Sequence, residues 1–229
     1  GLTYKAGDEF LSAARGKTIH PAIFFDSGGR SYSLPAHTLA SARGQGQPLT
    51  GKLTPSNGAR FLAVIMGLPD QKVLLASDAG YGFITDISNM VTKNTKGKAM
   101  LTVPRDCEPL PPVYVNNYET DHLAAITTEG RMLVIPVKAL PELPRGKGNK
   151  VIQIPPARLK KREEYLKLLE VIPAGATMKI HAGKQSVRFT PGNISDFIGE
   201  RGRRGKKLPR GYRKVDRVEV IRQLSDGGL

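Results

Sequence analysis

The sequence predicts an all-β protein built as a propeller-like disc of repeated blades. Two independent markers recur at intervals of about 50 residues. The apolar runs around them are four to seven residues long, are often β-branched or aromatic, and end at Gly, Pro, Asp or Asn, as strands do. A period near 50 with four short strands is typical of a blade, and one blade cannot bury both of its faces alone.

The first marker is a predicted hairpin, in which two apolar runs flank a turn that contains glycine. It occurs at residues 22–30, 73–81, 123–131 and 178–184. The turn glycines lie 51, 50 and 53 residues apart and are Gly29, Gly80, Gly130 and Gly183. Each hairpin therefore supplies two strands of one blade.

The second marker is a basic loop that contains glycine and follows each hairpin. The four loops span residues 43–46, 93–98, 145–148 and 201–207. Their last glycines lie 51, 51 and 57 residues apart and are Gly46, Gly97, Gly148 and Gly205. Because two unrelated features keep one period, chance is a poor explanation of the repeat.

A third feature is an apolar strand near the end of each unit. Residues 61–66 and 113–115 have this pattern, the run 10–14 lies 51 residues before 61–65, and residues 218–221 complete the set. The chain thus begins inside one blade and completes four more, so we predict four full blades and part of a fifth. We take residues 1–222 as a single domain and expect residues 223–229 to be disordered.

One short helical insertion is predicted near residues 157–166. Residues 157–169 contain good helix formers, and they fall where the spacing of the loops stretches from 51 to 57 residues. A basic docking helix and a solvated insertion at a blade edge both fit this segment, and the solvated insertion is the favoured interpretation.

The chain carries a large and uneven positive charge. Lys and Arg number 35 against 20 Asp and Glu, which gives a net charge of +15. Residues 1–110 contribute +4 and residues 111–229 contribute +11. Because such an excess opposes the compact state by self-repulsion, we expect a polyanionic partner, with nucleic acid first and an anionic membrane face second. Plain solubility charge is the alternative.

The sequence predicts no catalytic residue, no metal site, no cofactor and no small-molecule substrate. The four histidines are scattered, and the single cysteine, Cys107, lies in an acidic loop that disfavours a thiolate. One cysteine suits a reducing cytosol, and no apolar run approaches the roughly 20 residues of a membrane helix. Because neither an initiator methionine nor a signal region opens the sequence, we expect a piece of a longer cytoplasmic protein.

The basic glycine loops are the candidate contacts to nucleic acid. Lys and Arg supply charge and donors for phosphate oxygens, and glycine lets backbone amides approach them closely. One such loop per blade would space these charges around one rim, along which a duplex could lie. No recognition helix is visible, so binding should depend on the phosphate backbone and on DNA bendability. The candidates are Arg43, Lys52, Lys93, Lys96, Lys98, Arg145, Lys147, Lys150, Arg201, Arg203, Arg204, Lys206, Lys207 and Arg210.

Five stretches of the chain resemble the C-terminal domains of the DNA-cleaving subunits of bacterial topoisomerase IV, within the family of type IIA topoisomerases and gyrases. They are residues 2–8, 41–53, 76–83, 145–150 and 199–205. The resemblance covers about residues 1–222. It implies a β-pinwheel, a propeller-like disc in which neighbouring blades exchange strands and which has five blades in proteobacteria.

The resemblance also implies a DNA-binding domain without a catalytic site of its own. The DNA-cleaving tyrosine of the family and the ATPase of the partner protein (ParE) lie outside this chain. Gyrase tails wrap DNA through a Gln-Arg-Arg-Gly-Gly-Lys-Gly box, which this sequence lacks. Weaker binding and bending are therefore implied, which would help the enzyme select DNA crossings for decatenation and supercoil relaxation during chromosome segregation.

The implied partners are double-stranded DNA, the rest of the DNA-cleaving polypeptide and ParE in a heterotetramer, with a bacterial condensin as a further candidate. The implied location is the cytoplasm and nucleoid, with the inner face of the cell membrane as a further candidate. Two alternatives stay open: a propeller-type interaction module that docks an acidic partner, and a gyrase C-terminal tail that wraps DNA.

Overall fold

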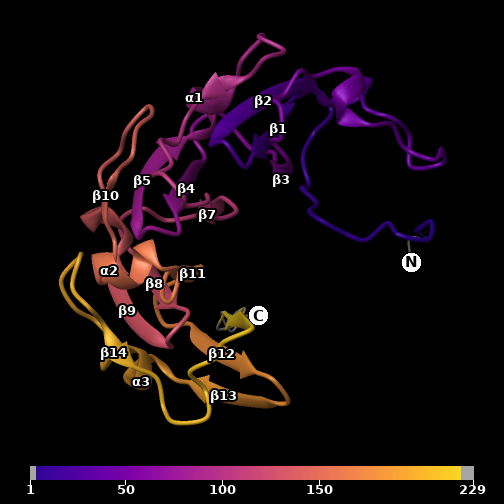
Figure 1. The fold of residues 1–229 in the computed structure, drawn as a ribbon. Helices are drawn as coiled ribbons and strands as arrows, with labels where there is room; N and C mark the ends of the chain where they lie inside the picture. Colours follow the sequence, from indigo (N-terminus) through magenta and orange to yellow (C-terminus); the bar gives the residue numbers. More distant parts are fainter. Residues whose placement is uncertain (1–3, 223–229) are drawn as a thin grey trace, which may run out of the picture.

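Four antiparallel sheets follow one another around an open arc (Figure 1). The structure, a computed structural model, describes residues 4–222. Each sheet is one blade, and its strands are ordered from the hollow of the arc to its outer side. We name them in that order the inner, middle, outer and rim strands.

The first three blades have all four strands. From inner to rim, the first blade contains β3 (Phe61–Ile65), β1 (Pro21–Asp26), β2 (Arg30–Pro35) and β6 (Lys98–Ala99). The second blade contains β7 (Val113–Val115), β4 (Lys72–Ser77), β5 (Tyr81–Asp86) and β10 (Asn149–Lys150). The third blade contains β11 (Leu166–Ile172), β8 (His122–Thr127), β9 (Arg131–Pro136) and β14 (Lys206–Lys207).

The fourth blade has three strands, which are β15 (Arg217–Ile221), β12 (Thr177–Ala182) and β13 (Gln185–Phe189). Within residues 4–222 no rim strand pairs with β13. Short helices connect the strands: η1 (Ala36–Thr38), η2 (Leu49–Gly51), α1 (Ile87–Met90), η3 (Val137–Ala139), α2 (Pro156–Lys160) and α3 (Pro191–Ser195).

Each rim strand comes from the repeat that follows its blade. The strand β6 lies after the hairpin of the second blade in the sequence, yet it pairs with β2 of the first blade. The strands β10 and β14 complete the second and third blades in the same way. This exchange confirms the β-pinwheel. The four hairpins confirm four blades, but only the first three are full, because residues 4–222 supply no rim strand to β13.

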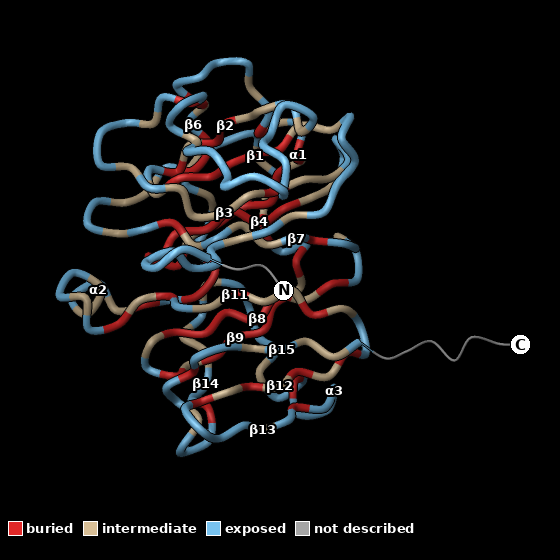
Figure 2. Tube along the Cα trace, turned by 90° about the vertical axis from the view of Figure 1, so that its right-hand side faces the viewer, coloured by how far each residue is buried: buried red, intermediate tan, exposed pale blue. Residues whose placement is uncertain are grey.

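The hydrophobic core lies between neighbouring blades. One cluster joins Ile23, Phe25 and Ile65 of the first blade to Leu75 and Phe83 of the second. Because the middle strands are packed on both faces, β4 and β8 are apolar along nearly their whole length, and the tube trace shows them buried (Figure 2). Every blade thus needs its neighbours to bury its own faces.

The helical insertion is shorter than predicted. The helix α2 covers only Pro156–Lys160, and Arg162 adopts a left-handed φ of 57°. From Leu166 the chain is the inner strand β11, which pairs with β8 as far as Ile172, with a register shift between Leu166 and Leu168. The edge of β8 therefore overrides the helix propensity of residues 166–169. The segment is also not a simple solvated insertion, because Glu164 is completely buried.

The predicted strand at residues 10–14 does not form. These residues have no regular secondary structure, and the Phe10 and Leu11 side chains are exposed. Inner strands elsewhere pair with the middle strand of their own blade, and the described chain contains no such strand for residues 10–14. The partial fifth blade is therefore not built here. The predicted disorder of residues 223–229 lies outside the described residues.

Candidate nucleic-acid interface

The rim strands bring three of the four basic loops to equivalent places on the disc. In each of the first three blades, the rim strand pairs with the first two residues of the outer strand. The paired loop residues are Lys98–Ala99, Asn149–Lys150 and Lys206–Lys207. The cations of the second, third and fourth loops therefore recur at one position per blade.

The last glycine of each of these loops packs against the outer strand of the preceding blade. Gly97 and Gly205 have φ of 77° and 74°, in the left-handed region. A Cβ at Gly97 would lie 2.6 Å from the ring of Tyr32, and a Cβ at Gly205 would lie 2.7 Å from the carbonyl oxygen of Met132. Both the backbone conformation and the close approach require glycine, which explains the sharp period of the loops.

Two arginines that directly follow turn glycines hold the loop supplied by the next repeat. The Arg30 guanidinium donates a hydrogen bond to the carbonyl oxygen of Gly97 (2.9 Å). Arg131 donates to the carbonyl oxygen of Gly205 (3.0 Å). Neither arginine was among the predicted contacts, although both occupy the same place in their hairpins. An arginine directly after the turn glycine of a hairpin is the sequence signal that identifies both of them.

The second blade uses different chemistry at the same place. Tyr81 follows the turn glycine, and the ammonium of Lys147 lies 4.0 Å from the centroid of its ring. This cation–π contact orients the third loop, as the arginine contacts orient the second and fourth. All three loops are thus held by the residue after a turn glycine.

Backbone hydrogen bonds join successive loops into one band. Gly146 of the third loop donates to the carbonyl oxygen of Met100, just after the second loop (2.9 Å). Gly202 of the fourth loop donates to the carbonyl oxygen of Val151, just after the third (2.8 Å). The loops lie on the outer side of the arc (Figure 1). We call residues 93–98, 145–150 and 201–207 together the basic rim.

Half of the predicted contact residues use their side chains partly within the domain. Lysines of this group donate to backbone carbonyls or cover a ring, and its arginines bind carbonyls or carboxylates. They are Lys52, Lys98, Lys147, Arg201, Arg203, Arg204 and Lys206.

The other half of the predicted residues are exposed and keep their full donor capacity. Within residues 4–222 their side chains form no hydrogen bond or ion pair. They are Arg43, Lys93, Lys96, Arg145, Lys150, Lys207 and Arg210. Six of these seven lie in or near the basic rim, and Arg43 does not.

The first loop is not joined to a blade in the described chain. Gly46 has a φ of 78°, as the other loop glycines do, but a Cβ there would have no atom within 4 Å. Residues 41–48 are all exposed. The first loop therefore shares the backbone conformation of the other loops, but its Gly46 does not pack against the outer strand of a blade as theirs do. Arg43 lies outside the basic rim.

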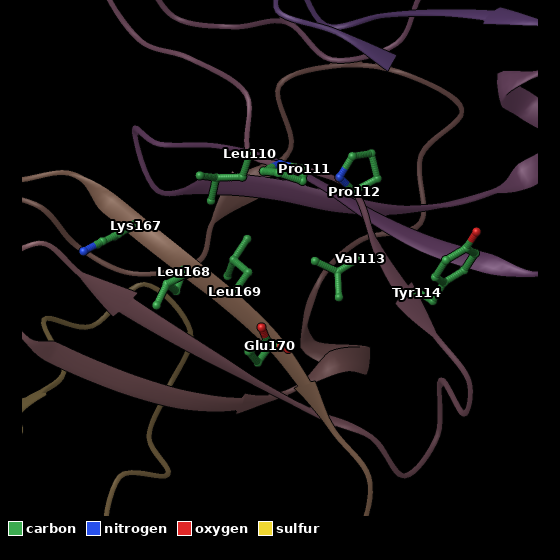
Figure 3. Close-up of a pocket in the computed structure, with 9 residues that line it drawn as sticks. All are labelled: Leu110, Pro111, Pro112, Val113, Tyr114, Lys167, Leu168, Leu169 and Glu170. Carbon is green, nitrogen blue, oxygen red and sulfur yellow. The ribbon is translucent and has the colours of Figure 1, made fainter. Parts of the chain in front are cut away.

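A separate apolar cavity of about 350 Å³ lies between the inner strands β7 and β11 (Figure 3). Its lining includes Leu110, Val113 and Leu169, and burial raises the pKa of Glu170 in it to about 7. The cavity faces the hollow of the arc, whereas the basic rim lies outside. It is therefore not part of the candidate interface.

Membrane-spanning helices and clusters of metal ligands are both absent from residues 4–222. No helix there is long and apolar enough to cross a membrane. No three His, Cys, Asp or Glu side chains there lie close enough together to hold a metal ion.

The chain is similar to proteins of one family over almost its whole length. The family model described as DNA gyrase C-terminal domain, beta-propeller, matches residues 71–107 and 121–171. The solved C-terminal domain of Escherichia coli ParC superposes with a TM-score of 0.88 at 48% identity, and the match covers 96% of this chain and 89% of that one. This chain belongs to the ParC C-terminal domain family.

Full-length relatives place the ParC C-terminal domain within a larger protein. The A subunit of DNA topoisomerase 4 from Pseudomonas aeruginosa is 51% identical over 220 residues, and its counterpart from E. coli K12 is 49% identical over 220 residues. Each match covers 96% of this chain and 29% of the relative. The chain therefore spans less than a third of the curated relatives that it matches.

Proposed function

We propose that this ParC C-terminal domain binds duplex DNA along the basic rim and bends it, without catalysing a reaction itself. The observation that supports the proposal best is that three basic loops lie at one position on successive blades and hydrogen-bond to one another in turn. Phosphates repeat along a duplex, so a periodic band of cations suits a periodic band of anions. Cations arranged on an arc favour a duplex that curves with it.

The cations without internal partners are the proposed phosphate contacts. Each loop of the basic rim presents at least one such lysine, namely Lys96, Lys150 and Lys207. If the domain neutralises about five phosphates, log–log plots of affinity against salt have a slope of about −4.5, and a threefold rise in salt weakens binding roughly 100-fold. An affinity that does not depend on salt would contradict the proposal.

Paired charge variants test the location of the interface. Lys150→Gln with Lys207→Gln removes two cations of the basic rim. Lys138→Gln with Lys167→Gln removes the same charge from η3 and the inner strand β11, away from the basic rim. We expect the first variant to flatten the salt slope by about 1.8 and the second to leave it nearly unchanged. Equal effects would contradict a localised rim and leave only net charge as the cause of binding.

A supercoil-capture assay tests bending. The domain is bound to relaxed plasmid, the plasmid is religated, and the change in linking number is measured. A zero or small shift agrees with bending, because the sequence lacks the box of the gyrase tail. A large shift of positive writhe would instead indicate wrapping of the gyrase type.

Within the larger protein, we propose that the domain helps topoisomerase IV select DNA crossings for decatenation and supercoil relaxation. It would act in the cytoplasm, on the nucleoid, beside the rest of ParC and its partner ParE, without a cofactor of its own. A holoenzyme that carries Lys150→Gln and Lys207→Gln should decatenate more slowly while its ATPase stays intact. A bacterial condensin is a further proposed partner; a pull-down that survives these substitutions would place it on another surface.

A further inference from the structure

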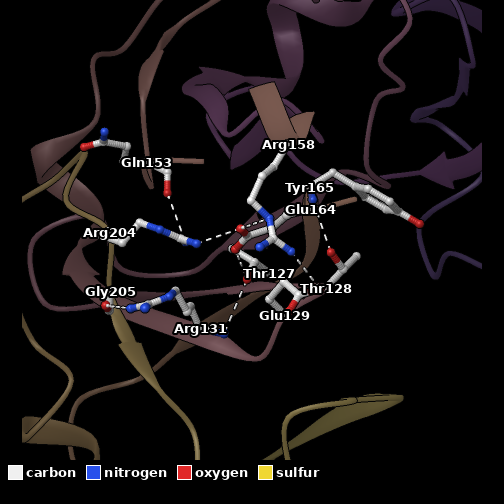
Figure 4. A network of polar contacts seen from close by, with 10 residues as sticks. All are labelled: Thr127, Thr128, Glu129, Arg131, Gln153, Arg158, Glu164, Tyr165, Arg204 and Gly205. Atoms are coloured by element: carbon white, nitrogen blue, oxygen red, sulfur yellow. Dashed lines mark hydrogen bonds and ion pairs between the residues drawn. The ribbon is translucent and has the colours of Figure 1, made fainter. Parts of the chain in front are cut away.

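Glu164 is a buried acidic residue that contacts Arg204 in the fourth loop of the basic rim (Figure 4). Its side chain is 0% exposed. One carboxylate oxygen accepts a hydrogen bond from the Thr127 hydroxyl at 2.9 Å, and the other accepts one from Arg204 at 2.6 Å. A carboxylate that is completely removed from water is costly unless it is paired and hydrogen-bonded, so this geometry has a specific use.

The ion pair connects three segments that are distant in the sequence. Glu164 lies between α2 and β11, Thr127 ends the middle strand of the third blade, and Arg204 belongs to the fourth loop. Next to Glu164, the N–H of Thr128 donates to the carbonyl oxygen of Tyr165 at 3.0 Å, which fixes this turn to the third blade. The Glu164 carboxylate is therefore held in a fixed position on the third blade, and its ion pair with Arg204 fixes the fourth loop to that blade.

Arg204 differs from its neighbour Arg203 in the same loop. The Arg203 side chain is 72% exposed and pairs with Glu200, which is 76% exposed. The Arg204 side chain is 30% exposed, and its second nitrogen group faces the carbonyl oxygen of Gln153 at 3.4 Å. Arg203 can exchange Glu200 for a phosphate at little cost. Arg204 would have to leave a buried carboxylate whose other cation, the Nε of Arg158, lies 3.6 Å away and makes no hydrogen bond to it.

We propose that Glu164 is a positioning residue for DNA binding, which acts through Arg204 to hold residues 201–207 where Arg203 and Lys207 meet phosphates. The proposal rests on the proposed function and assigns Arg204 a different role from its neighbours. It also makes an acidic residue necessary for binding a polyanion. Simple charge counting predicts the opposite, because removing a negative charge raises the net charge and should strengthen binding.

The test compares Glu164→Gln with Glu200→Gln in the whole chain, using a linear duplex of mixed sequence. Both variants remove one carboxylate that is paired with an arginine of the same loop. Glu164→Gln should weaken binding about tenfold and flatten the salt slope by about 1.8, which corresponds to two lost phosphate contacts. Glu200→Gln should bind as tightly as the wild type or a few-fold more tightly.

Amide hydrogen exchange gives a readout that does not need DNA. The N–H of Gly202 donates to Val151 and that of Gln153 donates to Arg203, so both amides report whether the loop is seated. In Glu164→Gln these two amides should exchange faster, while amides of the middle strand β8 keep their protection. Mere loss of stability would lower the bound fraction without changing the salt slope.

The outcomes separate the two proposals. If the wild type shows no salt-dependent binding to the duplex, the proposed function fails, and hydrogen exchange still decides whether Glu164 seats the loop. If the wild type binds and Glu164→Gln binds as tightly with the same slope, the positioning role is wrong. Should Glu164→Gln fail to fold, Glu164→Gln with Arg204→Gln keeps the net charge and leaves Arg158, the other cation beside residue 164, paired with Glu129. A wild-type slope in that double variant overturns the proposal.

Discussion

Substituting loop glycines tests whether the repeat is set by contacts between blades. Gly205→Ala and Gly46→Ala make the same change in the same backbone conformation, because φ is 74° at Gly205 and 78° at Gly46. The left-handed conformation costs alanine about 1–2 kcal/mol at either position if the loop cannot relax. The two sites differ in what surrounds the added methyl group.

At Gly205 the new Cβ would lie 2.7 Å from the carbonyl oxygen of Met132 and 2.9 Å from its carbonyl carbon. Both atoms are backbone of the outer strand β9, so neither can rotate away, and relief requires β14 to move off β9. Overpacking of this kind adds about 1–3 kcal/mol, so we expect a total loss of about 2–5 kcal/mol. At Gly46 no atom lies within 4 Å of the new Cβ, and the exposed loop can relax.

Thermal unfolding followed by circular dichroism measures the difference. For a chain of this size, we expect Gly205→Ala to lower Tm by about 5–15 °C and Gly46→Ala to lower it by less than about 2 °C. Gly205→Ala should also weaken DNA binding, because it displaces the fourth loop. Equal changes in Tm for the two variants would refute the reasoning, since the left-handed backbone alone would then explain the glycines.

Two further predictions concern Arg131 and Glu170. Arg131→Ala removes the donor to the Gly205 carbonyl, so DNA binding should weaken about tenfold. Lys184 follows the turn glycine of the fourth hairpin, where residues 4–222 supply no loop to hold, so Lys184→Ala should weaken binding less than about threefold. Fluorescence anisotropy with a labelled duplex measures both losses, and equal losses would contradict the holding role of Arg131. Burial raises the pKa of Glu170 to about 7, above its unfolded value of about 4.3, so the protonated form stabilises the fold and this contribution is lost as pH rises through 7. Glu170→Gln should therefore be more stable than the wild type by about 1–2 kcal/mol at about pH 8, after allowing for partial solvent exposure, and equally stable at about pH 4. Urea unfolding at the two pH values measures the difference. A gain in stability that does not depend on pH would indicate packing, and not the ionisation of Glu170, as its cause.

The four hairpins, their period and the basic loops could be read from the sequence because each depends on local chemistry. A tight turn needs glycine at positions 29 and 130, and the short apolar runs on either side of each turn specify a hairpin. A loop glycine with positive φ is also a local requirement. These signals recur once per blade, and repetition made each of them stronger.

The partners of these elements were decided only by the tertiary structure. A rim strand of two residues has no pattern of its own, and Arg30 meets Gly97 across 67 positions of sequence. Residues 166–169 favour a helix by propensity, but the free edge of β8 makes them a strand. For the same reason residues 10–14, which resemble an inner strand, stay irregular where the described chain offers them no middle strand of their own blade.

Tertiary contacts also decide which Lys and Arg side chains of the basic loops are bound within the domain and which face solvent. Composition marks every Lys and Arg of these loops as a candidate, since each carries the same charge. Only the folded chain shows that Arg204 meets Glu164 inside the domain while Lys207 faces solvent. Local patterns specify turns and strands because those depend on neighbouring residues, whereas pairing between blades depends on surfaces that exist only after the chain has folded.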